Sequence, residues 1–265
     1  MHAFNYHRPS NVNDAAALAA KSADSKLLAG GQSLVQAMKL RLAAPTDIVD
    51  LGMVKDLAGI KSDGKTVTIG AMTRHAEVTG SAEVKKAIPA LAVLAGMIGD
   101  RQVRNMGTLG GSLANSDPAA DYPAAVLGLG ATITTTKGTH AADKFFKGLY
   151  ETALRPGEII TSVSFPIPKR AGYMKFKNQA SRFAIVGVFV ADMGNGVRVA
   201  VTGAGPCVLR LAEMEKALGA KFAPESVAGL KVKSDGLNSD LHASAEYRAH
   251  LITVMAKRAV EAAMK

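Results

Sequence analysis

The sequence is poor in cysteine and aromatic residues, on which several large classes of protein depend. Among its 265 residues there is one cysteine, Cys207, there is no tryptophan, and aromatic residues make up only 5%. A single cysteine forms no internal disulfide and cannot by itself ligate an iron–sulfur cluster. We therefore expect a protein of a reducing compartment, with a core built mainly from Ala, Leu, Val, Ile and Met.

Long apolar segments are also absent. The longest apolar run, around residues 184–191, is far too short to span a bilayer, and the opening MHAFNYHRP has no apolar region typical of a secretory signal. These absences predict a cytoplasmic protein with no membrane span, and they leave peripheral association with a membrane open.

The chain is basic, with a formal net charge of +10, but its Lys and Arg residues are scattered. No dense basic run is interleaved with aromatic residues, so nucleic-acid binding is not favoured. A basic surface facing an acidic partner subunit or an anionic ligand fits better. The six histidines show no spacing typical of metal ligands, so we expect no metal on this chain.

The pattern of apolar residues predicts two parts. Residues 1–170 alternate strand and helix signals in two subdomains. The first, about 1–52, reads as a small β-α-β unit. The second, 53–170, has strands expected at 66–71, 131–136 and 158–165 and a polar loop expected at 99–107. The Pro-rich stretch 166–172 reads as a linker. Beyond it, three strands between 173 and 201 precede helices at 208–218, 225–230 and 245–264. The sequence thus predicts an α+β fold: two α/β subdomains, then a C-terminal domain, 171–265, of antiparallel sheet and helices.

The first segment of chemical interest runs from Leu27 to Leu34. An apolar strand leads into Gly30-Gly31, and a polar pair, Gln32-Ser33, opens a helix. Glycine lets a phosphate approach the backbone N–H groups with no Cβ in the way. The segment therefore suggests an anion site, although a plain strand-to-helix turn would use the same residues.

A second segment, Thr108-Leu109-Gly110-Gly111-Ser112, repeats this chemistry further along the chain. Neither segment is a P-loop or a Rossmann fingerprint, because the Lys-Ser/Thr pair and the G-x-G-x-x-G spacing are missing. Two glycine pairs with hydroxyl neighbours could hold a diphosphate from both sides.

The run Ile98 to Ala114, together with Phe4 to Pro9, Ala29 to Leu42 and Tyr173 to Val188, resembles the FAD-binding medium subunit of molybdenum hydroxylases. This is the family of aerobic carbon monoxide dehydrogenase and xanthine dehydrogenase. The resemblance covers essentially the whole chain. It implies a PCMH-type FAD-binding domain, similar to that of vanillyl-alcohol oxidase, followed by a C-terminal domain of the carbon monoxide dehydrogenase flavoprotein type.

The resemblance also implies which residues hold FAD. The pyrophosphate and ribityl would contact the first segment (Ala29, Gly30, Gly31, Gln32, Ser33, Leu34) and the second (Thr108, Leu109, Gly110, Gly111, Ser112). Asp121 would bond sugar or ribityl hydroxyls, and Ile98 and Ile160 would lie around the adenine and ring. Lys177 and Phe183 would approach the flavin.

Each of these single residues has a structural alternative. Asp121 could cap the helix that starts at Tyr122, Ile98 and Ile160 could be core residues, Phe183 could pack in the C-terminal domain, and Lys177 could be a solvated strand residue. No acid, base or nucleophile stands out on this chain, so no catalytic residue is predicted.

By resemblance the partners are a large molybdopterin subunit and a small subunit with two [2Fe-2S] clusters, in a dimer of heterotrimers. The chain would pass electrons from those clusters through FAD to a quinone, NAD or oxygen. One competing hypothesis is a stand-alone FAD-dependent reductase or oxidase of the same fold, which would need its own substrate pocket. The other is a non-catalytic binding or assembly subunit that has lost FAD.

Overall fold

The N-terminal unit is a small parallel sheet. A computed structural model describes residues 1–265. In this unit β1 (Asn5–His7), β3 (Asp47–Asp50) and β2 (Ser25–Leu28) pair in that order. The connections contain α1 (Val12–Ala19) and α2 (Leu34–Lys39), and the turns η1 (Leu51–Met53) and η2 (Lys55–Leu57) follow. The predicted β-α-β unit is confirmed, and Asn11 is the cap of α1, because its side chain accepts a hydrogen bond from the Asp14 N–H.

The middle unit is a five-stranded antiparallel sheet in the order β4-β5-β10-β6-β7. Sequence alternation predicted its three inner strands, β5 (Thr66–Gly70), β10 (Ile160–Pro166) and β6 (Thr132–Thr135). It did not predict the outer strands β4 (Ile60–Ser62) and β7 (Gly138–Ala141), which are short and mostly exposed and so show no apolar alternation.

Short helices cover this sheet. They are α3 (His75–Gly80), α4 (Ala82–Ala87), α5 (Pro89–Gly96), α6 (Arg101–Met106), α7 (Leu109–Asn115), α8 (Tyr122–Gly128) and α9 (Ala142–Phe145), and α9 leads into the hairpin of β8 (Phe146–Gly148) and β9 (Glu151–Thr152). With the sheet they form most of a core of 31 buried residues, which continues into the C-terminal unit through Tyr173, Phe189, Ala191, Ala200 and Val208. The prediction of a loop over 99–107 was wrong, since most of that stretch is α6. The Asp100 carboxylate accepts the Val103 N–H at 2.8 Å and caps this helix, which explains how such a polar segment becomes helical.

The C-terminal unit is an antiparallel sheet, β11 (Arg170–Lys177), β12 (Ala184–Asp192), β13 (Val197–Thr202) and β14 (Leu209–Arg210), paired in chain order. Helices α10 (Ala212–Ala220), α11 (Glu225–Ala228) and α12 (Ala245–Ala263) cover one face around a separate core of 15 buried residues. The helix predicted to begin at Val208 begins at Ala212, because Leu209 and Arg210 pair with β13 instead. No helix is both long and apolar enough to cross a membrane.

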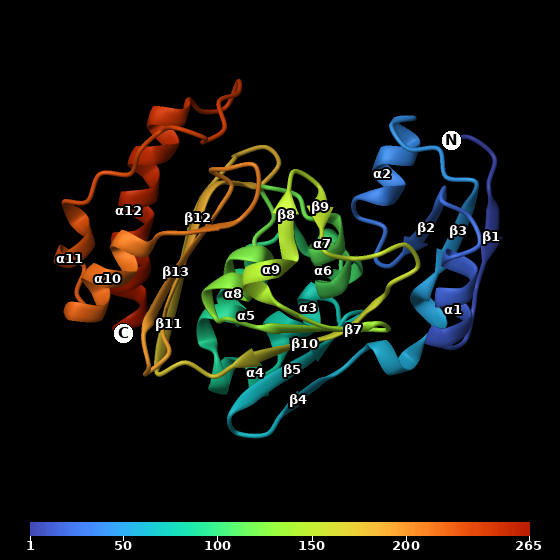
Figure 1. Cartoon of the computed structure of the whole chain (residues 1–265), viewed down its shortest axis with the longest axis horizontal. Helices are drawn as coiled ribbons and strands as arrows, with labels where there is room; N and C mark the ends of the chain where they lie inside the picture. The colour runs from blue at the N-terminus through green and yellow to red at the C-terminus, as the bar shows by residue number, and fades with distance from the viewer.

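The three units follow one another across the molecule (Figure 1). The parallel sheet lies at one end, the sheet with α12 at the other, and the five-stranded sheet with its helices between them. This confirms the expected α+β architecture of two N-terminal subdomains and a C-terminal sheet-and-helix unit. The two glycine segments belong to the first and middle units respectively, so the space they share lies where those units meet.

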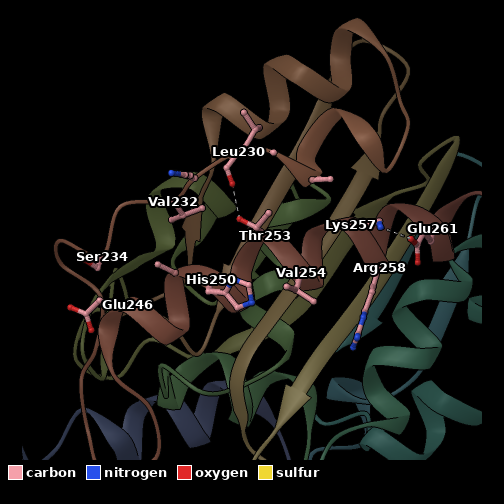
Figure 2. Close-up of a pocket in the computed structure, with 14 residues that line it drawn as sticks. Leu230, Val232, Ser234, Glu246, His250, Thr253, Val254, Lys257, Arg258 and Glu261 are labelled. Atoms are coloured by element: carbon pink, nitrogen blue, oxygen red, sulfur yellow. Dashed lines mark hydrogen bonds and ion pairs between the residues drawn. The ribbon is translucent and has the colours of Figure 1, made fainter.

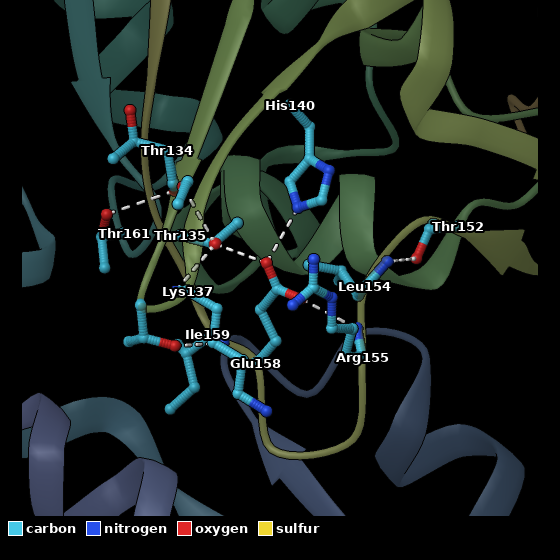
Figure 3. Close-up of polar contacts among 12 residues, drawn as sticks. Thr134, Thr135, Lys137, His140, Thr152, Leu154, Arg155, Glu158, Ile159 and Thr161 are labelled. Carbon is cyan, nitrogen blue, oxygen red and sulfur yellow. Dashed lines mark hydrogen bonds and ion pairs between the residues drawn. The ribbon is translucent and has the colours of Figure 1, made fainter.

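A buried polar network fixes the 154–159 turn within the middle unit (Figure 3). The Glu158 carboxylate accepts hydrogen bonds from Thr135 Oγ1 at 2.5 Å, from His140 Nε2 at 2.8 Å and from the Arg155 N–H at 3.0 Å. Burial raises the pKa of Glu158, but these hydrogen bonds outweigh it and hold the pKa to about 2. The next residue, Ile159, packs in the small core of the first unit, so the network anchors the junction between the two units.

Candidate functional site

The first glycine segment connects β2 to α2 and exposes a run of backbone donors. Gly31 has a φ of +73°, a left-handed conformation that favours glycine. None of the backbone N–H groups from Gly30 to Leu34 donates to a backbone carbonyl, and the Ser33 side chain forms no cap. Several free N–H groups in succession form an anion-binding concavity. The geometry therefore supports the anion site inferred from sequence over a plain turn.

The second segment is organised differently from the first. Thr108 caps α7, and its Oγ1 accepts the Gly111 N–H at 3.2 Å. The Leu109 N–H donates to the Thr73 carbonyl at 3.1 Å and the Gly110 N–H to the Ala71 carbonyl at 2.8 Å. These donors are already satisfied within the protein. The Gly110-Gly111 pair is the first turn of a helix and not a loop, and its N–H groups are not free for a ligand.

Close packing explains why positions 110 and 111 are both glycine. A Cβ on Gly110 would lie 2.5 Å from the Ala71 Cβ, and one on Gly111 would lie 2.9 Å from Thr108 Oγ1. Atoms cannot approach this closely without something shifting. Glycine at these two positions lets α7 begin directly against the end of β5.

The two segments lie against each other, although at least 74 positions separate them in sequence. A Cβ on Gly30 would lie 2.0 Å from the Met106 carbonyl oxygen and 2.7 Å from the Gly107 Cα, and one on Gly111 would lie 3.3 Å from the Ala29 Cβ. The structure thus brings together the segments that sequence paired. The first segment supplies free N–H donors. Met106 and Gly107, which directly precede the second segment, form with Gly111 the wall against which the first segment packs.

Behind this wall lies a buried aromatic pair with unsatisfied polar atoms. The rings of His75 and Tyr122 are 5.3 Å apart, and neither His75 Nδ1 nor the Tyr122 hydroxyl has a hydrogen-bond partner. Burial, and secondarily the Arg104 charge, lowers the pKa of His75 to about 4, so its imidazole is neutral at pH 7. His75 packs against Gly107, where a Cβ would lie 2.5 Å from its Nε2.

Asp121 is buried at the contact between the middle and C-terminal units. Its carboxylate accepts hydrogen bonds from the Tyr173 hydroxyl at 2.5 Å and from Lys175 Nζ at 2.9 Å. Burial raises the pKa of Asp121, and the neighbouring ammonium of Lys175 opposes that rise. Lys175 Nζ also donates to the Met97 carbonyl at 3.1 Å. Asp121 occupies the N-cap position of α8, as the alternative expected, but its side chain makes no cap hydrogen bond.

Lys175 was missed by the sequence analysis, which singled out Lys177. Alternation along a strand places Tyr173, Lys175 and Lys177 on one face, and this was the available signal. A β-bulge between Phe176 and Lys177 then breaks the register. As a result the side chain of Lys175 is 1% exposed, whereas Lys177 is exposed.

The remaining predicted residues lie in different surroundings. Ile98 is half-buried, and its carbonyl accepts a hydrogen bond from Arg104 Nη1 at 3.0 Å. Ile160 is 4% exposed within the large core, so its side chain is a core residue. Phe183 is 48% exposed at the end of the loop between β11 and β12. Phe183 therefore does not pack in the C-terminal core.

A surface groove lies elsewhere (Figure 2). It is about 860 Å³ in volume and runs along α12 opposite residues 228–234, with His250, Thr253 and Lys257 among its lining. It is on the far side of the C-terminal unit from both glycine segments. No three His, Cys, Asp or Glu side chains gather where they could hold a metal ion.

Comparisons with known proteins agree with this geometry. Residues 2–168 match the model of the FAD binding domain in molybdopterin dehydrogenase, and residues 171–263 match that of the CO dehydrogenase flavoprotein C-terminal domain. The chain is 37% identical to the nicotine 6-hydroxylase medium subunit of Paenarthrobacter nicotinovorans, over 97% of this chain and 96% of that one. It is 36% identical to the carbon monoxide dehydrogenase medium chain of Afipia carboxidovorans, over 98% and 96%.

A solved structure shows the same fold. A chain of the reconstituted CO dehydrogenase from Oligotropha carboxidovorans superimposes with a TM-score of 0.90 at 35% sequence identity, covering 98% of this chain and 97% of that one. The likeness therefore extends over all three units.

Proposed function

The chain belongs to the family of FAD-binding medium subunits of molybdenum hydroxylases, and on this premise we propose that it passes electrons from [2Fe-2S] clusters of a partner subunit, through FAD, to an external acceptor. The acceptor is a quinone, NAD or oxygen. The FAD supplies the redox chemistry when bound, and the protein supplies binding, orientation and electrostatics.

The observation that carries the proposal is the row of free N–H groups from Gly30 to Leu34. A pyrophosphate needs several donors at close range, and these five residues offer them with no side chain in the way at Gly30 and Gly31. The wall formed by Met106 and Gly107 fixes the row from behind. The residues present therefore fit the group that the family implies.

The rest of the site belongs to the same proposal. Thr108 to Ser112 support the pyrophosphate segment, chiefly by holding it in place. Asp121, already bonded to Tyr173 and Lys175, has acceptor capacity left for a cofactor hydroxyl. Ile98 and the backbone at Ile160 lie around the adenine and the isoalloxazine ring of FAD. Phe183 and Lys177 approach the flavin.

We also propose the domain division and the assembly. Residues 1–170, divided near residue 52, form the FAD-binding domain, and residues 171–265 form the C-terminal domain; the separate sheets support this. The partners are a large molybdopterin subunit and a small iron–sulfur subunit. Substrate is selected on another chain, because relatives at 37% and 36% identity carry the names of enzymes for nicotine and for carbon monoxide.

A spectrum and an activity assay test the proposal. The purified full chain, mixed with FAD and desalted, should retain the absorbance bands of oxidised flavin and yet oxidise no purine, aldehyde, N-heterocycle or CO. A chain that retains no flavin would contradict the proposal. Robust substrate oxidation by the chain alone would instead support a stand-alone flavoenzyme.

A further inference from the structure

The loop between β11 and β12 carries a strained residue. Residues 178–183 are held by their own hydrogen bonds: the Asn178 side chain accepts the Ala180 and Ser181 N–H groups, and the Arg182 N–H donates to the Asn178 carbonyl. Arg182 has a φ of +63°, which costs a non-glycine residue free energy. Such strain persists only where the surroundings impose it, and it points to function.

The side chain of Arg182 reaches across to the middle unit. Its Nη1 donates to the Gly99 carbonyl at 3.2 Å. The same carbonyl accepts Arg104 Nη1 at 3.1 Å, so two guanidinium groups converge on one turn. Neither arginine has a carboxylate partner within 4.0 Å, so their contacts serve the turn and not an ion pair.

The Gly99 turn is a rigid anchor for this contact. Gly99 itself has a φ of +50°, and a Cβ there would lie 2.7 Å from the Val103 side chain. The turn is followed by Asp100, the cap of α6, whose last residue, Met106, touches Gly30. The turn before α6 therefore accepts the Arg182 hydrogen bond, and the last residue of α6 packs against Gly30, where the run of free N–H groups begins.

Phe183 follows Arg182 directly and is 48% exposed. The Asn178 N–H donates to the Phe183 carbonyl at 2.9 Å, which fixes the backbone of Phe183 at the base of the hairpin. An exposed aromatic ring on an ordered loop is suited to stack on a flat ligand. The position of the ring then depends on where the loop is docked. The Asn178 side chain contacts His242 of the C-terminal unit, and the Arg182 side chain makes the contact that docks the loop onto the middle unit.

We propose that Arg182 is a positioning residue that latches the 178–183 loop onto the Gly99 turn and so sets Phe183 against the ring of the bound flavin. The inference rests on the proposed function, since it needs FAD in the site. It assigns to Arg182 a role distinct from contact with the cofactor. The strained φ is retained because it lets Arg182 point to Gly99 while Phe183 points to the ring.

The test compares variants of the full chain in FAD titrations, with visible circular dichroism of the bound flavin as a second readout. Arg182→Ala and Arg182→Gly should each weaken FAD binding by roughly fivefold or more and change the flavin dichroism, and Arg182→Lys should restore part of both. Arg258→Ala, at an exposed arginine on α12, is the matched control and should match the wild type.

A double-mutant cycle separates latching from general damage. If Arg182 acts through Phe183, Phe183→Ala should weaken FAD binding to a similar degree, and the double variant should be little worse than either single variant. Additive losses, or an Arg182→Ala variant indistinguishable from Arg258→Ala, would overturn the inference alone. A wild-type chain that binds no FAD would overturn the proposed function.

Discussion

At the scale of single residues, the site depends on positions where an added side-chain atom would clash or where a lost charge would leave its buried partner without a counter-charge. Gly30 is such a position, because its missing Cβ lets the free N–H row lie directly on the Met106–Gly107 backbone. Lys175 is another, because its ammonium is the buried counter-charge of Asp121.

Gly30→Ala should push the two glycine segments apart. A Cβ 2.0 Å from a backbone carbonyl oxygen forces the backbone to move, so FAD affinity should fall by more than about tenfold. Gly219→Ala is the control, since a Cβ at Gly219 meets no atom within 4 Å. Fluorescence titration with FAD measures both variants, and equal affinities would show that the close approach at Gly30 is not needed.

Lys175→Met should destabilise the fold by about 3–5 kcal/mol, because it leaves a buried carboxylate without its counter-charge. The double variant with Asp121→Asn should recover part of this loss. Lys257→Met removes the ammonium of an exposed pair with Glu261, at 3.9 Å, and should cost less than about 0.5 kcal/mol. Urea unfolding of the apo chain provides the comparison; similar losses at Lys175 and Lys257 would contradict the buried pair.

At the scale of elements, local signals were enough to predict the strand-turn-helix at Leu27 to Leu34 and the inner strands of the middle sheet. Local signals failed for α6, a polar helix with no apolar periodicity that is capped by Asp100. They also failed for the short outer strands β4 and β7. The choice of Lys175 over Lys177 depends on a bulge and on a partner 54 positions away, Asp121, which no local pattern encodes.

The Glu158 network predicts how the junction of the first two units responds to acid. The folded-state pKa of Glu158, about 2, lies below its ordinary value of 4.5, so ionised Glu158 stabilises the fold above pH 4.5. That contribution, roughly 1–3 kcal/mol, is lost as the pH falls from 4.5 through 2.

Glu158→Gln should therefore lower the unfolding free energy at pH 7 and flatten its decline between pH 5 and about 2. Glu261→Gln, at an exposed position of α12, is the matched control and should follow the wild-type curve. Urea unfolding across this pH range gives both curves. A Glu158→Gln curve parallel to that of the wild type would show that His140 and Thr135 do not hold the charged carboxylate.

At the scale of the whole molecule, the proposed site draws on three units, and each supplies something different. The first unit offers the free donors of Gly30 to Leu34, the middle unit the wall at Met106 to Gly111, and the C-terminal unit the 178–183 loop. The C-terminal unit is held to the middle one by Thr202 Oγ1, which donates to the Ala120 carbonyl at 2.6 Å, and by the Asp121 cluster. No unit alone completes the site.

The central claim is that the pyrophosphate of FAD rests on the Gly30 to Leu34 amides. Amide resonances of the ¹⁵N-labelled full chain, followed during titration with FAD, test it most directly. The account predicts that the resonances of Gly30 to Leu34 shift most, and those of Gly110 and Gly111, which already donate within the protein, shift less. FAD binding that leaves the Gly30 to Leu34 resonances unmoved would contradict it.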